Sequence, residues 1–144
     1  MTSQGFTLVE LLLCVAIISL LAGLSIPVSE SFNRNNDLDI ATQLLASGLR
    51  RAEAYARASN TDNAWSVEVQ SSTVTLFQGT SFGGRNTAYD EAFSLPGTIT
   101  PSGTTEVQFS KFAATPNTSA TITLTSTTNN TRTVTVNAKG MVDY

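Results

Sequence analysis

Apolar residues are concentrated at the N-terminal end of the chain. Residues 11–28 contain no charged side chain, and extending this stretch back to Phe6 adds only Glu10. A helix that rises 1.5 Å per residue needs about 20 apolar residues to cross the hydrocarbon core of a membrane. The pattern predicts an apolar helix over residues 6–28 that crosses a membrane once. A cleaved secretory signal peptide fits less well, because residues 1–5 carry no Lys or Arg and no small-x-small site follows.

The pattern stays helical beyond Pro27 but becomes amphipathic over residues 29–59. Apolar side chains recur there every three or four residues, with charged side chains between them. They are Leu38, Ala41, Leu45, Leu49, Ala52 and Ala56. We predict that this apolar stripe packs against a sheet. Pro27 lacks a backbone donor and is predicted to kink the helix, and residues 60–63 (NTDN) are predicted to end it.

The periodicity then changes from 3.6 to 2, which predicts antiparallel strands within residues 60–144. The alternating apolar positions are Trp65, Val67 and Val69; Val74 and Leu76; Val107 and Phe109; Ile122 and Leu124; and Val134 and Val136. Residues 125–131 are predicted to connect a hairpin, and residues 79–85 and 96–103 are predicted to be loops. The expected fold class is α+β: a long kinked N-terminal helix packed on a C-terminal antiparallel β-sheet domain.

Charge changes this picture little. Charged residues make up 13% of the chain, against roughly 25% in an average soluble protein, and the net charge is −3. Phosphate binding requires clustered cations, so a general DNA-coating function is not expected. The densest basic cluster is Arg50, Arg51 and Arg57, which we interpret as a solvated helix flank that pairs with Glu53.

Candidate chemistry is sparse. The sequence has no histidine, which removes the usual general base and the commonest metal ligand. Its one cysteine, Cys14, lies in the apolar stretch and is expected to serve in packing. Gly83 and Gly84 lack the rest of a phosphate loop, and Asp90 and Glu91, expected in a solvated loop, lack the spaced ligands of a calcium loop. We expect no enzymatic activity, no cofactor and no metal site.

Glu10 is the anomaly of the apolar stretch. An acidic side chain at membrane depth costs roughly 2.5 to 3.5 kcal/mol on insertion scales and requires a partner. The alternative is that Glu10 only marks the aqueous edge of a helix that begins at Leu11. We interpret it as functional because of the residues around it.

Those residues, GFTLVELL from Gly5 onward, stand ahead of the long apolar run. The string resembles the class III signal of type IV pilins and type II secretion pseudopilins. The resemblance implies that a prepilin peptidase cuts between Gly5 and Phe6, that residues 1–5 are a leader, and that Phe6 becomes methylated. Pro27, 21 residues after Phe6, resembles the helix-kinking proline of this family. The leader departs from the family in having no basic residue.

Cleavage would create an amine on Phe6, which is protonated at neutral pH because an α-amino group has a pKa of about 7.7 to 8.0. The carboxylate of Glu10 and such an ammonium can neutralise one another. If the ammonium belongs to a neighbouring subunit, the pair sets the register of assembly inside an apolar bundle.

A second resemblance covers residues 45–69 and 131–142. An Arg-Ala-x-Ala helix leading into a strand, and a final strand of the form V-x-V-x-x-x-G ending at Gly140, resemble the minor pseudopilin and minor pilin domain of the GspH/FimT type. Some relatives bind DNA through an arginine-containing tail after this glycine. Residues 141–144 contain no arginine, so DNA binding is not expected here.

The resemblance implies a structural subunit, a minor pilin or pseudopilin, of an inner-membrane-anchored type IV pilus or type II secretion filament. Its expected partners are other pilin subunits, through the N-terminal helix, and the prepilin peptidase and methylase. The expected topology is a single pass of the inner membrane, with the C-terminal domain on the periplasmic or extracellular side. The alternative is a membrane-anchored binding module whose β domain captures DNA or a surface ligand.

Overall fold

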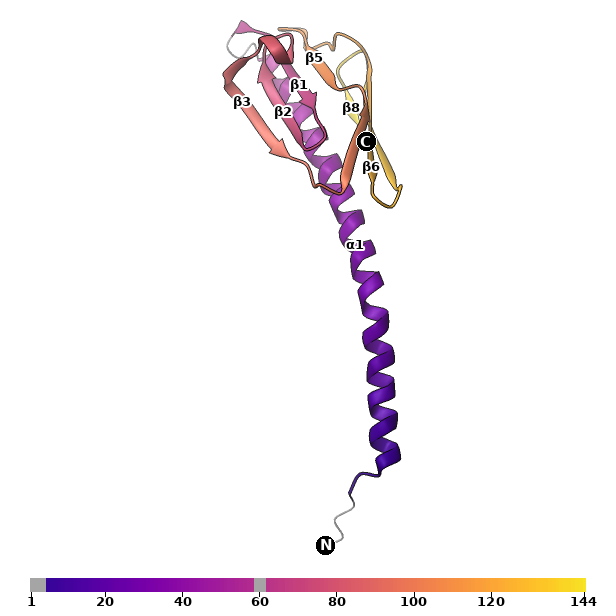
Figure 1. Cartoon of the computed structure of the whole chain (residues 1–144). Helices are drawn as coiled ribbons and strands as arrows, with labels where there is room; N and C mark the ends of the chain where they lie inside the picture. Colours follow the sequence, from indigo (N-terminus) through magenta and orange to yellow (C-terminus); the bar gives the residue numbers. More distant parts are fainter. Residues whose placement is uncertain (1–4, 59–61) are drawn as a thin grey trace. The chain divides into compact units, whose positions relative to one another are not determined.

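The computed structural model describes residues 5–58 and 62–144, with the side chains of residues 24–35 outside the description. One long helix, α1 (Leu8–Arg57), precedes all the strands (Figure 1). The chain divides into two compact units, Met1–Asn33 and Arg34–Tyr144, which are described separately below. The kink expected at Pro27 falls among the residues without described side chains and stays a prediction. Among the residues whose side chains are described, no helical segment is long and apolar enough to cross a membrane.

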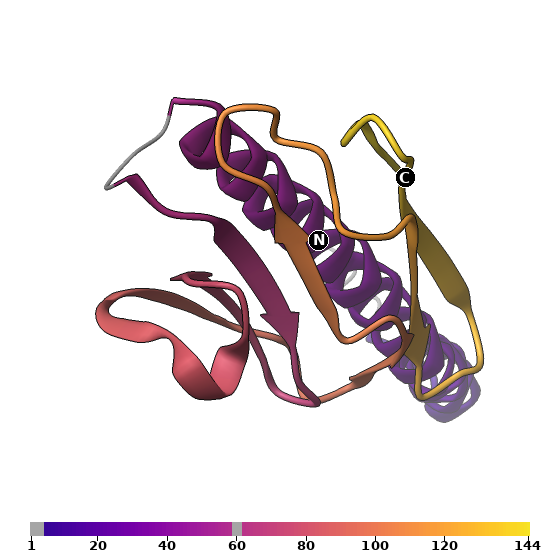
Figure 2. The same cartoon turned by 90° about the horizontal axis from the view of Figure 1, so that it is seen from above.

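In the second unit, the C-terminal half of α1 lies along the β structure (Figure 2). The six members of the predicted apolar stripe, from Leu38 to Ala56, are at most 1% exposed, which confirms the stripe. They share one hydrophobic cluster with side chains of six strands, among them Leu76, Phe109 and Leu124. Beyond the helix, the backbone N–H of Phe112 donates to the carbonyl oxygen of Ala56, 3.0 Å away, and satisfies one of the carbonyls that a helix end leaves free.

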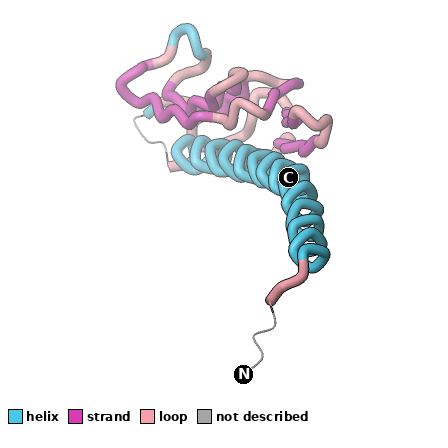
Figure 3. Tube along the Cα trace, turned by 60° about the horizontal axis from the view of Figure 1, so that its bottom comes forward, coloured by secondary structure: helices cyan, strands magenta, loops and turns pink. Residues whose placement is uncertain are grey.

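The strands, coloured magenta in Figure 3, form two antiparallel four-stranded sheets, where the periodicity predicted one sheet. The first sheet has the order β3-β2-β1-β5 and consists of β1 (Trp65–Val69), β2 (Thr73–Gln78), β3 (Asn86–Ser94) and β5 (Glu106–Phe109). The second has the order β4-β6-β7-β8 and consists of β4 (Ile99–Gly103), β6 (Ala120–Ser126), β7 (Thr131–Val136) and β8 (Val142–Asp143). A 3₁₀ turn, η2 (Phe82–Gly84), connects β2 to β3.

All five segments with alternating apolar positions are strands: β1, β2, β5, β6 and β7. The hairpin connection predicted for residues 125–131 joins β6 to β7, with Thr125 paired to Thr131 at its base. β6 buries every second side chain, as the alternation on which the prediction depends requires. β1 and β2 bury nearly all of theirs, including polar ones.

Two loop predictions were wrong. Residues 96–103 contain β4, which pairs with β6 from Ile99 to Gly103. Asp90 and Glu91 lie in β3 rather than in a loop. Both β3 and β4 are edge strands that bury few side chains, so they lack the alternation that marks a half-buried strand. Pro101 has no backbone N–H group. It is compatible with β4 because an edge strand pairs on one side only and does not use every N–H group in hydrogen bonds.

Candidate functional site

The sequence places the candidate processing and assembly residues in the first unit. Gly5, Phe6 and Thr7 are not helical, and α1 begins at Leu8. Phe6 is 79% exposed. The expected cleavage site, the peptide bond between Gly5 and Phe6, therefore lies in exposed non-helical backbone immediately before the helix.

Thr7 caps this helix. Its Oγ1 accepts a hydrogen bond from the backbone N–H of Glu10 at 3.3 Å, and its carbonyl oxygen accepts one from the N–H of Leu11 at 3.2 Å. Thr7 is thus the N-cap residue and Glu10 is the third helical residue. Our sequence analysis missed this role, although the signal is present: Thr-Leu-Val-Glu has the S/T-x-x-E spacing of a capping box.

Glu10 itself lies in the first turn of α1 and is exposed. A negative charge at this end of a helix is favourable, because the first backbone N–H groups give the N-terminus a partial positive charge. No other described residue forms an ion pair with Glu10, so within the described part of the chain its carboxylate remains available to a partner.

The helix that follows exposes apolar side chains on all its faces. Their exposed fractions run from 77% at Leu8 to 50% at Ile17. The exposed set is Leu8, Val9, Leu11, Leu12, Leu13, Val15, Ile17, Ile18, Leu20 and Leu21. Cys14 is exposed among them, so the packing expected for it does not occur within the single chain. The hydroxyl of Ser19 donates to the carbonyl oxygen of Val15 at 2.7 Å, which satisfies this polar group locally. A helix that is apolar all round requires cover by lipid or by other helices.

The clustered arginines of α1, Arg50, Arg51 and Arg57, are engaged within the second unit. Arg57 pairs with Glu53 at 2.5 Å, as the sequence predicted. Arg50 donates to the carbonyl oxygen of Val142 at 3.3 Å, and its guanidinium lies 5.0 Å from the centre of the Tyr144 ring. These two arginines therefore do not form a free basic surface.

Arg51 differs from the prediction of a solvated flank. Its guanidinium forms an ion pair with Glu91 of β3 and donates to the hydroxyl of Tyr55 at 3.2 Å. The hydrogen bond to Tyr55 is the largest contribution that raises the pKa of Arg51, and the charge of Glu91 adds to it. Arg51 therefore links the helix to the first sheet.

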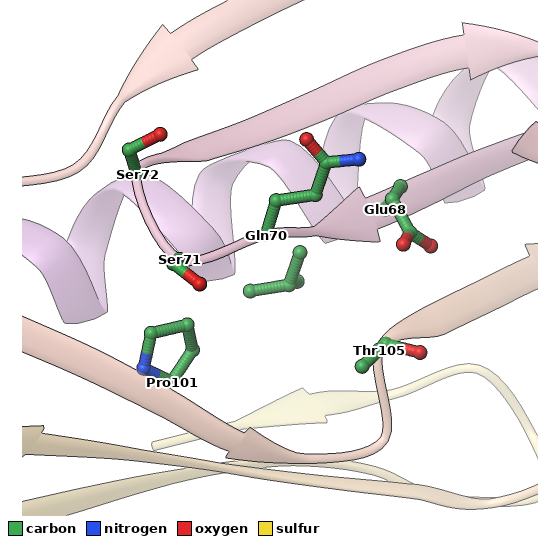
Figure 4. Close-up of a pocket in the computed structure, with 7 residues that line it drawn as sticks. Glu68, Gln70, Ser71, Ser72, Pro101 and Thr105 are labelled. Atoms are coloured by element: carbon green, nitrogen blue, oxygen red, sulfur yellow. The ribbon is translucent and has the colours of Figure 1, made fainter.

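A shallow pocket of about 520 Å³ lies between the β1–β2 turn and the β4–β5 connection (Figure 4). Its lining consists of Glu68, Val69, Gln70, Ser71, Ser72, Pro101 and Thr105. Glu68 stands opposite Glu106 on the neighbouring strand. Burial raises the pKa of the Glu68 carboxyl, and the charge of Glu106 raises it further. The lining contains one carboxyl group, that of Glu68, and no cationic side chain that would bind a phosphate group.

No cluster of three or more His, Cys, Asp or Glu side chains that could hold a metal ion is present among the described residues. The pocket supplies hydroxyl, amide and carboxyl groups, but the sequence has no histidine to pair with a nucleophile. The candidate site residues remain the sequence-predicted Gly5, Phe6 and Glu10, and their roles stay predictions.

Residues 1–26 match the prokaryotic N-terminal methylation motif, which marks type IV pilins and type II secretion pseudopilins. The N-terminal segment of the chain therefore carries the motif of this family. Proteins of this family are structural subunits and not enzymes.

The fold of this chain is similar to the structure of the minor pseudopilin EpsH from the type 2 secretion system of Vibrio cholerae. The TM-score is 0.58 at 13% sequence identity, and the match covers 74% of this chain and 94% of EpsH. This similarity confirms the α+β pilin-like fold. No curated protein matches the sequence.

Proposed function

We propose that this pilin-like protein is a minor pilin or pseudopilin that assembles through its N-terminal helix into a filament rooted in the inner membrane. The observation that carries the proposal is the exposed apolar helix from Leu8 to Leu21, preceded by an exposed peptide bond at Gly5–Phe6. Lipid covers this helix before assembly, and the helices of neighbouring subunits cover it afterwards. The filament belongs to a type IV pilus or to a type II secretion system.

The chemistry of assembly follows from cleavage. Removal of residues 1–5 leaves a protonated amine on Phe6, next to the partial positive charge of the helix N-terminus. A carboxylate is needed to offset this positive charge, and Glu10 provides one in the first helical turn. When the amine of one subunit meets Glu10 of the next, both charges are neutralised in an apolar environment.

The alternative function, capture of DNA by the β domain, has less support. Arg50, Arg51 and Arg57 are occupied by contacts within the chain, and the pocket beside β1 carries the carboxylate of Glu68. A phosphate backbone requires available cations. The features of the second unit are those of a packed domain that the N-terminal helix anchors.

Processing is tested by co-expression of the full chain with a prepilin peptidase. Intact-mass and N-terminal peptide analysis of membrane-extracted protein should show a chain that begins at a methylated Phe6. A mature chain that begins at Met1, or near Ser25 after cleavage of an ordinary signal peptide, contradicts the proposal.

Assembly is tested at Glu10. Glu10→Val should insert into the membrane as well as the wild type or better, because it removes an acidic group, and Glu10→Gln removes the charge while keeping the shape. Both variants should be cleaved after Gly5, accumulate in the inner membrane and be depleted from sheared filaments. The matched control is Glu68→Gln, the same chemical change in the β domain, which should enter filaments normally. Unchanged incorporation of the Glu10 variants would favour a simple membrane anchor.

A further inference from the structure

The backbone around the expected cleavage site changes conformation within three residues. Gly5 and Phe6 are non-helical, Thr7 caps α1, and Leu8 begins the helix. A protease cleaves only a segment of chain that can leave its helical conformation and enter the active site. When this opening is fast, the cleavage rate follows the population of the open form. A peptide bond held within a helix is a poor substrate for this reason.

The residue at which the helix starts therefore decides whether the Gly5–Phe6 bond is helical. The residues upstream of Thr7 do not by themselves prevent a helix from starting earlier. The leader contains Ser3, a residue type that also caps helices, and Phe6 stands three residues after it. A helix capped at Ser3 would include the Gly5–Phe6 bond. Gly5 opposes such an extension, since glycine within a helix costs roughly 0.5 to 1 kcal/mol relative to alanine. The hydrogen bond from the Glu10 N–H to Thr7 Oγ1 favours the later start.

We propose that Thr7 is a positioning residue for processing: by capping α1 two residues after the cleavage site, it keeps the Gly5–Phe6 bond in accessible non-helical backbone. This inference rests on the proposed cleavage between Gly5 and Phe6. The role belongs to the oxygen acceptor of the side chain, since the structure shows Oγ1 holding the N–H of the third helical residue. Other residues that cap helices should therefore replace threonine.

The test is a capping series in the full-length precursor, in membranes that contain a prepilin peptidase, with the initial rate of appearance of the chain beginning at Phe6 as the readout. Thr7→Ala and Thr7→Val remove the acceptor, and Val keeps the shape of the side chain. Loss of a cap of about 1 kcal/mol corresponds to a roughly fivefold change in an equilibrium, which is the upper limit of its effect on the open population, so both variants should be cleaved more slowly, by up to about fivefold. Thr7→Ser, Thr7→Asn and Thr7→Asp should be cleaved at close to the wild-type rate.

Ser19→Ala is the matched control, because it removes a hydroxyl that bonds to the backbone of the same helix, away from the cleavage site. Its cleavage rate should not change. A second readout does not depend on the peptidase: in isotope-labelled, detergent-solubilised precursor, the NMR carbon shifts of Gly5 and Phe6 should be non-helical in the wild type and move toward helical values in Thr7→Ala.

Wild-type cleavage rates for Thr7→Ala and Thr7→Val would overturn the inference while leaving the proposed processing intact. The inference would also be overturned if Thr7→Ser were the only substituted precursor cleaved at the wild-type rate. The peptidase would then recognise the hydroxyl group itself and not the cap. Unchanged carbon shifts in Thr7→Ala would also overturn the inference. A wild-type precursor that is not cut between Gly5 and Phe6 would overturn the proposed function together with it.

Discussion

The guanidinium of Arg51 on α1 forms an ion pair with the carboxylate of Glu91 on β3. The two residues are far apart in the sequence, and this contact joins the helix to the outermost strand of the first sheet. Tyr55 adds to it, because its hydroxyl accepts a hydrogen bond from Arg51 and lies 3.5 Å from Glu91 Oε1. The edge strand β3 buries little apolar surface, so such polar contacts are a larger share of what holds it.

The Arg51–Glu91 pair should make a small but measurable contribution to stability. Both side chains are partly exposed, so a double-mutant cycle of Arg51→Met and Glu91→Gln should give a coupling energy of about 0.2 to 1 kcal/mol. The free energy of unfolding of the wild type, the two single variants and the double variant is measured by urea denaturation. The coupling should fall at high salt, and a coupling of zero at low salt would show that the contact does not stabilise the fold.

Gly140 requires the absence of a side chain. Its φ is +88°, and a Cβ atom placed there would lie 2.7 Å from the carbonyl oxygen of Ala114. Gly140→Ala should therefore lower the free energy of unfolding by more than about 1 kcal/mol. Gly48 is the matched control: it lies within α1, and a Cβ there would meet only Val74 Cγ1 at 3.7 Å.

Gly48→Ala should raise the free energy of unfolding by roughly 0.5 to 1 kcal/mol, because alanine favours helix over glycine. Chemical denaturation of both variants measures the two effects in one assay. Equal effects of the two substitutions would mean that the contact between Gly140 and Ala114 is not as the structure shows it.

Glu68 should make stability depend on pH. Its carboxyl pKa is raised in the folded state by burial and by Glu106, so the folded chain binds this proton more tightly than the unfolded chain. The stabilising contribution of the proton is full below the unfolded pKa of about 4.5 and is lost as the pH rises through the higher folded value.

Glu68→Gln should flatten this dependence and raise the free energy of unfolding at pH 7 by less than about 1 kcal/mol, because Glu68 is only partly buried and solvent screens its charge. Denaturant unfolding at several pH values between 4 and 7 checks the sign. A stability that rises across this range equally in the wild type and in Glu68→Gln would contradict the assignment to Glu68.

The second unit should fold without the apolar half of the helix. The hydrophobic cluster lies entirely within the unit Arg34–Tyr144, from Leu38 onward. A fragment of residues 29–144 should be monomeric and show a cooperative thermal transition by circular dichroism with both helical and strand signals. Residues 60–144 alone provide the control, and they should not fold, because the apolar stripe of α1 completes the cluster.

Several features of the fold followed from the sequence because their causes are local. The stripe from Leu38 to Ala56 repeats at the period of a helix, so its buried face could be predicted without knowing its partner. The five strands with alternating side chains were predicted in the same way. The N-cap at Thr7 was also within reach of the sequence, because the S/T-x-x-E spacing is contained in four consecutive residues.

Other features depended on which segments become neighbours. The strand β4 was predicted to be a loop because it contains Pro101 and ends at Gly103, and only its pairing with β6 makes it a strand. Gly103 has a φ of +95°, and a Cβ there would lie 2.4 Å from the carbonyl oxygen of Thr121, so the glycine serves the close approach of β6. No pattern within residues 96–103 predicts their pairing with that distant strand.

The sequence by itself determined the apolar run from Phe6, the motif around Gly5 and Glu10, and the two periodicities, because each is a property of residues adjacent in the chain. The tertiary structure alone decided the division into two sheets, the place of Asp90 and Glu91 in an edge strand, and the partner of Arg51. The edge strands β3 and β4 bury little on either face, and a surface charge pairs with whichever opposite charge the packing brings near it. Neither outcome leaves a periodic trace in the sequence, so both required the folded chain.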